Sequence, residues 1–428
     1  MTLLRSLRGR HWLLLAASLA ISFGVWRWAR RILVPAYTRK VLASSRPVGN
    51  NSDLYPRWLG SRELFLHGRD PYSAEVTREI QTGFYGRPLD PNNPADPTAR
   101  EAFVYPLYVA FLLAPVVTLP FSTAAEIFRG ILLLAIAVSV PLWMYAIRLR
   151  PPWPVTVSAM LLAASTFPAV EEYFQQNLTA LAVLFLAAAA AAAAHNWFAL
   201  SGFFLALATV KPDTTGLMVL WFVLWAAAGW KIRRPLIFGF FGTMTVLVLA
   251  AEAISPHWIG GFFAGLRQYS RYDTDPSILS ALSTPLLGKL FSLLLCGGLM
   301  VVGWRHRKAP AGSAGFAWSL ACVAAVTLTV LPKLAAYNQL LLIPALLVMA
   351  DTKVSGLIRR ALVKAALACQ IWQWLAASIL ALASLLVAGT RLEAAAEVPL
   401  FTLLALPPLA VFAVLAAALT LPVEATSA

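Results

Sequence analysis

The sequence has little charge, since Asp, Glu, Lys and Arg make up 12% of its 428 residues. This is about half of the roughly 25% that is typical of soluble domains. Cysteine is also rare, and Cys296, Cys322 and Cys369 lie inside apolar runs without CxxC or other metal-binding spacing. We therefore expect the three thiols to contribute to packing and not to bind a metal.

Several motifs of catalysis are missing as well. The chain contains no P-loop, GxGxxG, HExxH or GxSxG pattern, so nucleotide-driven pumping and serine or zinc hydrolysis have no motif to support them. His257 stands alone, which is more typical of a structural histidine than of a metal ligand. We predict no cofactor and no metal-ligand cluster, and the sequence leaves a requirement for a divalent metal open.

Apolar residues are abundant instead. Hydrophobic residues make up 60% of the chain and the mean hydropathy is +0.72. Apolar runs recur along the sequence, each near the ~20 residues that cross a bilayer, so we predict an all-α integral membrane protein in which 1–428 form a single polytopic domain. The apolar runs are 11–26, 103–120, 124–147, 153–169, 177–194, 196–210, 214–230, 236–254, 279–304, 315–332, 334–350, 364–388 and 400–421.

The first apolar run begins like a signal peptide, because arginines precede it. A small-residue cleavage site does not follow, since Trp26, Trp28 and two arginines come next, and we predict a retained first span. The long polar segment 27–102 comes after it. We expect this segment to form an outer loop between the first and second spans.

The formal net charge is +15, with 34 Lys and Arg against 19 Asp and Glu. Nucleic acid binding is one interpretation, but the basic residues concentrate in short loops, as the positive-inside rule predicts for cytoplasmic loops. We therefore expect no nucleic acid partner. Segment 103–120 contains Pro106, Pro115 and Pro120, so we predict that it dips into the membrane without crossing it, which leaves twelve spans with both termini inside.

In this orientation, most of the remaining polar residues lie at the outer ends of the apolar runs. Charged groups at these ends would cost several kcal/mol if they faced lipid, so we expect them to meet in a water-filled cavity. The predicted chemistry, if the protein has any, is on the outer face.

The stretch DLYPRWLGSRELFLHGRDPY, residues 53–72, contains the first group of candidates. Apolar residues with Arg57 and Glu63 between them fit a helix that lies along a membrane surface, and HGRDPY is typical of a turn. Asp53 stands at the start of this helix. From the residues alone it is either the N-cap, a role that Ser52 would fill equally well, or a catalytic carboxylate.

A second polar group, EEYFQQN, stands immediately before an apolar run. It is either a solvated loop with a helix cap or a sugar site, because amides and carboxylates can donate to or accept from the hydroxyls of a diol. A further amide, in LPKLAAYNQ, stands at the entrance to another run. The candidate sugar- or acceptor-binding residues are Glu171, Glu172, Gln175, Gln176, Asn177 and Asn338.

Four basic residues are candidates for binding a phosphate. Arg267 and Arg271 are four residues apart and therefore on one helical face, and guanidinium groups bind phosphate through paired hydrogen bonds. Lys211 in TVKPD and Lys333 in LPKLAAYNQ would each add a point charge. The alternative for each residue is a basic side chain that extends to the membrane interface.

Together these motifs resemble glycosyltransferase family 87 of the GT-C superfamily. The resemblance rests on an outer Asp soon after the first span, followed by a W…R…G.DPY pattern. It rests also on Gln176-Asn177 at the start of a long apolar helix and on GFFLALATVKP from Gly202. The family pattern has Gly-Gln-x-Asn where this chain has Gln175-Gln176-Asn177. The motifs cover the first half of the chain, and the second half is similar mainly in topology.

The resemblance implies a GT-C-like bundle of about twelve transmembrane helices, a first outer loop with surface helices, and a catalytic Asp53 in that loop. It implies transfer of a mannose-like hexose or a pentose from a polyprenyl-phosphate donor to a lipid or glycan acceptor, with inversion. The location would be the outer face of a bacterial cytoplasmic membrane. The alternatives are a transporter or flippase of lipid-linked sugars, for which the sequence lacks two corresponding halves, and a non-catalytic assembly protein.

Overall fold

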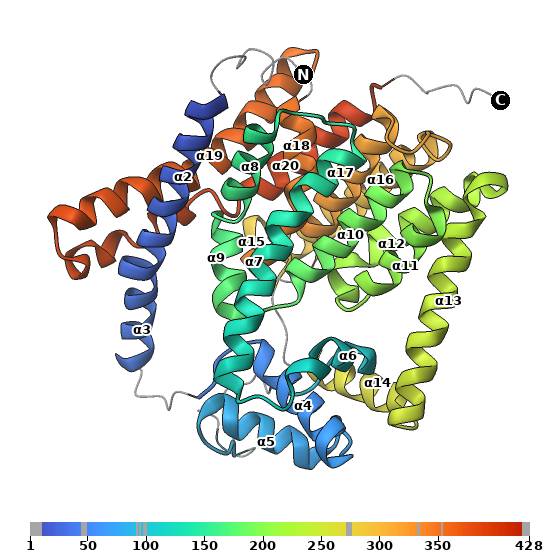
Figure 1. Ribbon diagram of the computed structural model, residues 1–428. Helices are drawn as coiled ribbons and strands as arrows, with labels where there is room; N and C mark the ends of the chain where they lie inside the picture. The colour runs from blue at the N-terminus through green and yellow to red at the C-terminus, as the bar shows by residue number, and fades with distance from the viewer. Residues whose placement is uncertain are drawn as a thin grey trace.

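The computed structural model describes residues 11–43, 49–90, 93, 96, 101–270, 276–331, 334–351 and 354–421. Within these ranges every regular element is a helix, and the helices form one bundle with a separate layer of shorter helices at one end (Figure 1). The prediction of an all-α fold is confirmed. The long apolar helices also make the chain a membrane protein.

Among the described residues, five helices are long and apolar enough to cross a membrane, and a sixth span results if one bent pair is counted. The bent pair, α8 and α9, changes direction by 57°. The count of twelve spans stays a prediction. The elements concerned are α2 (His11–Trp28) with η1 (Ala29–Leu33) and α3 (Val34–Ala43), α7 (Phe121–Ala146), α13 (Trp230–Ile254), α16 (Pro285–Arg305), α19 (Leu357–Leu386), α8 (Trp153–Ala163) and α9 (Phe167–Gln175).

Shorter apolar helices fill the interior between these spans. Helix α10 packs against α7 and α11, and its alanine run is buried at Ala189, Ala190 and Ala193, which is the close small-residue packing typical of membrane bundles. The interior elements are α10 (Thr179–Ala194), α11 (Phe198–Ala208), α12 (Pro212–Ala228), α17 (Ala314–Val330), η4 (Ala336–Leu342), α18 (Ile343–Asp351) and α20 (Leu406–Ala418).

A layer of short helices lies at one end of the bundle, at the bottom of Figure 1. The remaining short elements connect the spans. The layer consists of α4 (Leu54–His67), α5 (Ala74–Tyr85), η2 (Leu107–Val109), α6 (Ala110–Leu113), η3 (Ala114–Val116) and α14 (Trp258–Tyr269), and the connecting elements are α15 (Ile278–Leu282), η5 (Gly389–Ala395) and η6 (Val398–Leu400).

The proline-rich segment 103–120 contains only three short pieces, which together run from Leu107 to Val116. At 1.5 Å per residue these ten residues reach about 15 Å, half of the ~30 Å hydrocarbon core. The segment packs under α4, because the indole of Trp58 donates a hydrogen bond to the carbonyl of Val116 (3.3 Å). This geometry is consistent with a segment that dips into the membrane, and the membrane depth itself stays a prediction.

The helix expected along the membrane surface, α4, is present but is more buried than a surface helix. Arg57 is fully buried and Glu63 is nearly so, because α6 and η3 cover one side of α4 and α5 packs on another. The prediction of a helix that lies along a membrane surface is therefore wrong for these two positions, because their side chains are covered by protein. The predicted turn after α4 is confirmed, since Gly68 ends the helix in a left-handed conformation (φ 64°).

Tyr72, at the end of this turn, ties the layer together. Its hydroxyl donates a hydrogen bond to the carbonyl of Tyr105, and its ring packs edge-to-face on Phe103. Burial and the neighbouring carboxylate of Asp70 raise the pKa of Tyr72, so its hydroxyl remains a neutral donor. The loop from α4 to α5 is thus fixed on the segment that follows it.

Candidate functional site

Asp53 precedes α4 at the boundary between the layer of short helices and the bundle. Its backbone N–H donates a hydrogen bond to the carbonyl of Gln175 at the end of α9 (2.8 Å). Although Asp53 occupies the N-cap position, its side chain accepts no capping hydrogen bond from the described helix. The hydroxyl of Ser52 accepts from the N–H of Leu54 instead (3.2 Å). The Asp53 carboxylate is therefore free of the capping role that the sequence left open.

Asn177 contacts that carboxylate directly. Its Nδ2 donates a hydrogen bond to Asp53 Oδ2 at 2.7 Å, and the Asn177 side chain is only 3% exposed. Asn177 follows α9 by two residues and stands just before α10, so the break between these helices brings the amide to the start of α4. Two residues that are 124 positions apart in sequence thus form one polar pair.

Lys211 is the centre of a larger polar group that includes the pair of Asp53 and Asn177. It precedes α12, is 4% exposed, and donates hydrogen bonds from Nζ to Asn177 Oδ1 (2.7 Å), Thr179 Oγ1 (2.6 Å) and Asn338 Oδ1 (2.9 Å). The ammonium also lies 4.6 Å from the centre of the Tyr337 ring, within the range of a cation–π interaction. The sequence therefore contributes four separate segments to one buried polar group.

Arg57 supplies a second buried cation beside Asp53. One helical turn after Asp53, its guanidinium donates hydrogen bonds to the Asp53 carbonyl and to the hydroxyl of Tyr105. The guanidinium carbon lies 4.0 Å from the centre of the Tyr105 ring. Arg57 contacts the backbone of Asp53, and Lys211 is linked to the Asp53 carboxylate through the amide of Asn177, so a negative charge at this site has two cationic neighbours.

The two glutamates of α9 have different environments. Glu171 Oε2 accepts a hydrogen bond from the backbone N–H of Tyr337 (2.6 Å), which joins α9 to η4. Glu172 is fully buried, and its Oε1 accepts from the N–H of Ala180 (2.9 Å) in the first turn of α10, where a carboxylate interacts favourably with the helix dipole. Glu171 is therefore nearer to an open surface than Glu172.

The two glutamines at the end of α9 differ in the same way. Gln175 is exposed, whereas Gln176 is buried in a left-handed conformation (φ 56°). The Gln176 amide donates to the carbonyl of Ala125 (2.6 Å) and its Oε1 accepts from the hydroxyl of Ser52 (2.9 Å). Gln176 thus joins the segment before α4 to α7.

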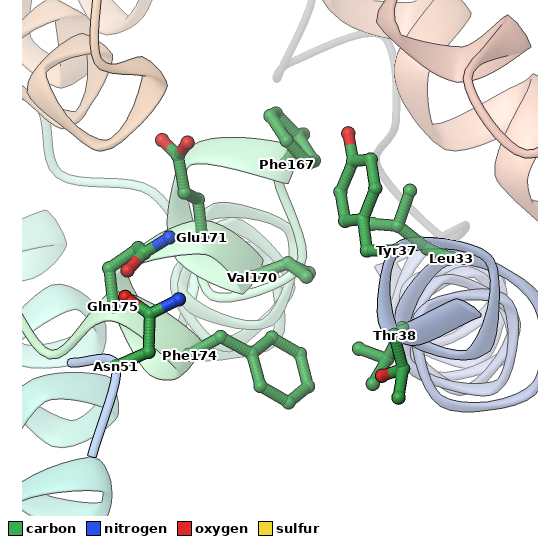
Figure 2. A pocket seen from close by; sticks show the side chains of 10 residues that line it. Leu33, Tyr37, Thr38, Asn51, Phe167, Val170, Glu171, Phe174 and Gln175 are labelled. Carbon is green, nitrogen blue, oxygen red and sulfur yellow. The ribbon is translucent and has the colours of Figure 1, made fainter. Parts of the chain in front are cut away.

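An open cleft of about 480 Å³ lies beside this polar group, between α9 and the end of the first long helix. Figure 2 shows Glu171, Gln175 and Asn51 on one side, facing Tyr37 and Thr38 on the other. The rest of the lining is apolar and comprises Leu33, Val34, Phe167, Val170 and Phe174. Both sides of the cleft carry polar and apolar side chains, which suits an amphipathic molecule.

The predicted phosphate-binding residues are not all in this group. Arg267 is exposed near the end of α14, in the layer of short helices. Arg271 and Lys333 lie outside the described residues. Of the two predicted cations that the structure describes, Lys211 lies in the polar group that contains Asp53 and Arg267 does not. The polar group also contains Glu171, Glu172, Gln175, Gln176, Asn177 and Asn338.

Sequence reasoning missed three members of the polar group: Arg57, Tyr105 and Thr179. Arg57 follows Asp53 by four residues, which is a signal for one helical face, and Thr179 follows Asn177 by two. Tyr105 gives no such signal, since only the folded segment before η2 brings it to Arg57. Within the described ranges, no group of three or more His, Cys, Asp or Glu side chains is arranged to hold a metal ion.

The fold and this site define a helical membrane protein with a carboxylate next to two buried cations at one end of its bundle. A family comparison is more specific. The model of glycosyltransferase family 87 matches residues 103–332, more than half of the chain, and the chain belongs to that family. The match includes Asn177, Lys211 and Arg267 but begins after Asp53 and α4. Neither the curated proteins nor the solved structures that were searched gave a match.

Proposed function

We propose that this glycosyltransferase moves a mannose-like hexose or a pentose from a polyprenyl-phosphate donor to a hydroxyl of a lipid or glycan acceptor. The proposed location is the outer face of a bacterial cytoplasmic membrane. The observation that carries the proposal is the Asp53 carboxylate, which accepts one hydrogen bond from Asn177 and makes no helix cap in the described structure. A carboxylate in this state can serve as a general base.

The proposed reaction has one displacement step. The acceptor oxygen attacks the anomeric carbon of the donor sugar from the face opposite the phosphate, and the bond between that carbon and the phosphate oxygen breaks. The proton of the acceptor hydroxyl passes to the carboxylate of Asp53, and polyprenyl phosphate leaves. Attack from the opposite face inverts the anomeric configuration.

The leaving phosphate gains negative charge in this step, so cations at its position would stabilise the transition state. Our candidates are Arg267 and Arg271, because a guanidinium can bind a phosphate through paired hydrogen bonds, and Lys333, whose ammonium would add a point charge. Lys211 is a weaker candidate for direct contact, since it is 4% exposed and its hydrogen bonds are engaged within the protein. The polyprenyl chain would remain in lipid beside the bundle.

The acceptor would approach through the cleft in Figure 2. In this proposal the hydroxyls meet Glu171, Gln175 and Asn51, while an apolar portion packs on Phe167 and Phe174. Carboxylates and amides can accept from or donate to sugar hydroxyls. Asn51 lies two residues before Asp53, so a hydroxyl at this end of the cleft would be near the base.

The test combines cell lipids with the purified protein. A deletion strain should accumulate a lipid species that lacks one hexose or pentose. Mass spectrometry of its lipid extract, compared with that of the parent strain, would detect this species. The purified protein in detergent should then transfer that sugar to this species from a polyprenyl-phosphate donor. A deletion strain in which complete glycolipids accumulate on the inner leaflet would favour a flippase. Loss of the sugar in cells without transfer by the purified protein would favour an assembly protein.

A further inference from the structure

Asn177 is the only side chain in the polar group that contacts both the Asp53 carboxylate and the Lys211 ammonium, among the residues described. An asparagine amide has a donating end and an accepting end. An ammonium can only donate, so Lys211 requires the Asn177 oxygen to face it. The Nδ2 end is then turned toward Asp53, where it donates to Oδ2 at 2.7 Å.

Lys211 is suited to hold this orientation and is poorly placed to bind a substrate. An ammonium has three donors, and the three acceptors within 2.9 Å are the oxygens of Asn177, Thr179 and Asn338. The side chain is 4% exposed. A phosphate could contact this ammonium only if these bonds broke.

We propose that Asn177 and Lys211 are positioning residues that hold one oxygen of Asp53, Oδ2, and leave Oδ1 to accept the proton of the acceptor hydroxyl. This inference rests on the proposed function, in which Asp53 is the base. It replaces a phosphate-binding role for Lys211 and a sugar-binding role for Asn177.

Asn177→Asp is the sharpest test. The new carboxylate would pair with Lys211 and lie next to the carboxylate of Asp53, where Asn177 Nδ2 is now 2.7 Å from Oδ2. Two carboxylates this close share one proton, which raises the pKa of one of them. At neutral pH we expect kcat to fall about tenfold or more, because part of the contribution of general base catalysis is lost. Activity should recover at higher pH, with the acid limb of the pH–kcat profile moved upward by at least about one pH unit. The KM values for donor and acceptor should stay unchanged.

Lys211→Met separates positioning from phosphate binding. Without the ammonium the Asn177 amide can rotate, and we expect kcat to fall about tenfold with an unchanged donor KM. Thr214→Val is the matched control, because Thr214 lies three residues later in α12, is also buried, and has a hydroxyl that makes no hydrogen bond within the described structure. This control should retain wild-type kcat and KM. If Lys211→Met does not fold, Asn177→Asp still tests the positioning role. Its new carboxylate can accept the hydrogen bond from Lys211, so we expect this variant to fold.

Two results would overturn the inference. One is an Asn177→Asp enzyme whose pH–kcat profile matches that of the wild type, and the other is a Lys211→Met enzyme with raised donor KM and unchanged kcat. Asp53→Asn in the same assay identifies which proposal fails. If Asp53→Asn is inactive while Asn177→Asp retains the wild-type profile, only the positioning role is refuted. Full activity of Asp53→Asn refutes the base itself.

Discussion

Asp53→Asn tests the central assignment, because asparagine keeps the size of the side chain and cannot accept a proton. The structure also predicts which way the new amide points. Asn177 presents Nδ2 to position 53, so the oxygen of the new amide would accept that hydrogen bond. The NH2 end would then face the acceptor hydroxyl, where a donor stands in place of the base.

The expected loss can be stated in magnitude. General base catalysis contributes about 10²–10⁴-fold, which corresponds to about 3–5 kcal/mol of activation free energy. The effect on folding should be smaller. The hydrogen bond from Asn177 persists but loses its charged acceptor, and this difference is worth about 1 kcal/mol. We therefore expect kcat to fall by two to four orders of magnitude while the melting temperature in detergent changes by only a few degrees.

The assay measures sugar transfer from a polyprenyl-phosphate donor by purified wild-type and variant protein. Asp70→Asn is the matched control, since Asp70 is an exposed acid of the same loop whose Oδ1 accepts from the N–H of Tyr72 (3.0 Å), a bond that asparagine can also accept. This control should transfer at the wild-type rate. An Asp53→Asn protein that also transfers at that rate would refute the base, and one with raised KM alone would indicate a binding role.

Three further outcomes are expected. Arg57→Lys loses the guanidinium that donates both to the Asp53 carbonyl and to the Tyr105 hydroxyl, so the unfolding free energy measured by thermal denaturation should fall by about 1–3 kcal/mol. Arg78→Lys, at an exposed position, should leave the unfolding free energy nearly unchanged. Equal stabilities of the two variants would contradict a stabilising role for the buried Arg57 guanidinium. The double variant Arg267→Ala, Arg271→Ala should raise the donor KM or lower kcat while the protein stays folded, and unchanged kinetics would remove both from the phosphate site. A reporter fused after Asn92, in the predicted outer loop, should be active only outside the cytoplasm, and cytoplasmic activity would reverse the proposed orientation.

The helices were predictable from the sequence because apolar runs give a strong local signal. Every apolar run contains a helix in the structure, and the proline-rich run 103–120 is broken as its prolines suggest. The number of membrane crossings was harder to predict from the sequence. Several interior helices are shorter than a bilayer, such as α11 with 11 residues, and hydropathy does not distinguish a short span from a buried interior helix.

The polar group was only partly predictable, because local patterns do not reveal what covers a charged residue. Glu171, Asn177 and Lys211 were recognisable since polar residues at the ends of apolar helices tend to face one another away from lipid. The burial of Arg57 was not recognisable. It depends on α6 and η3, which pack on α4 from a segment about 50 residues later. The exposed position of Arg267 and the buried position of Lys211 likewise result from tertiary packing.

The position of Asp53 relative to the bundle depends on the end of α9, where the backbone adopts an uncommon conformation. Gln176 has a positive φ of 56° although it is not glycine, which carries a conformational cost. That turn lets the Gln175 carbonyl meet the N–H of Asp53, while the Gln176 side chain holds Ser52 and α7. The next residue, Asn177, then reaches the Asp53 carboxylate. One strained turn thus anchors the backbone and the side chain of Asp53 together, which explains how an aspartate that precedes α4 can be held against the helix bundle.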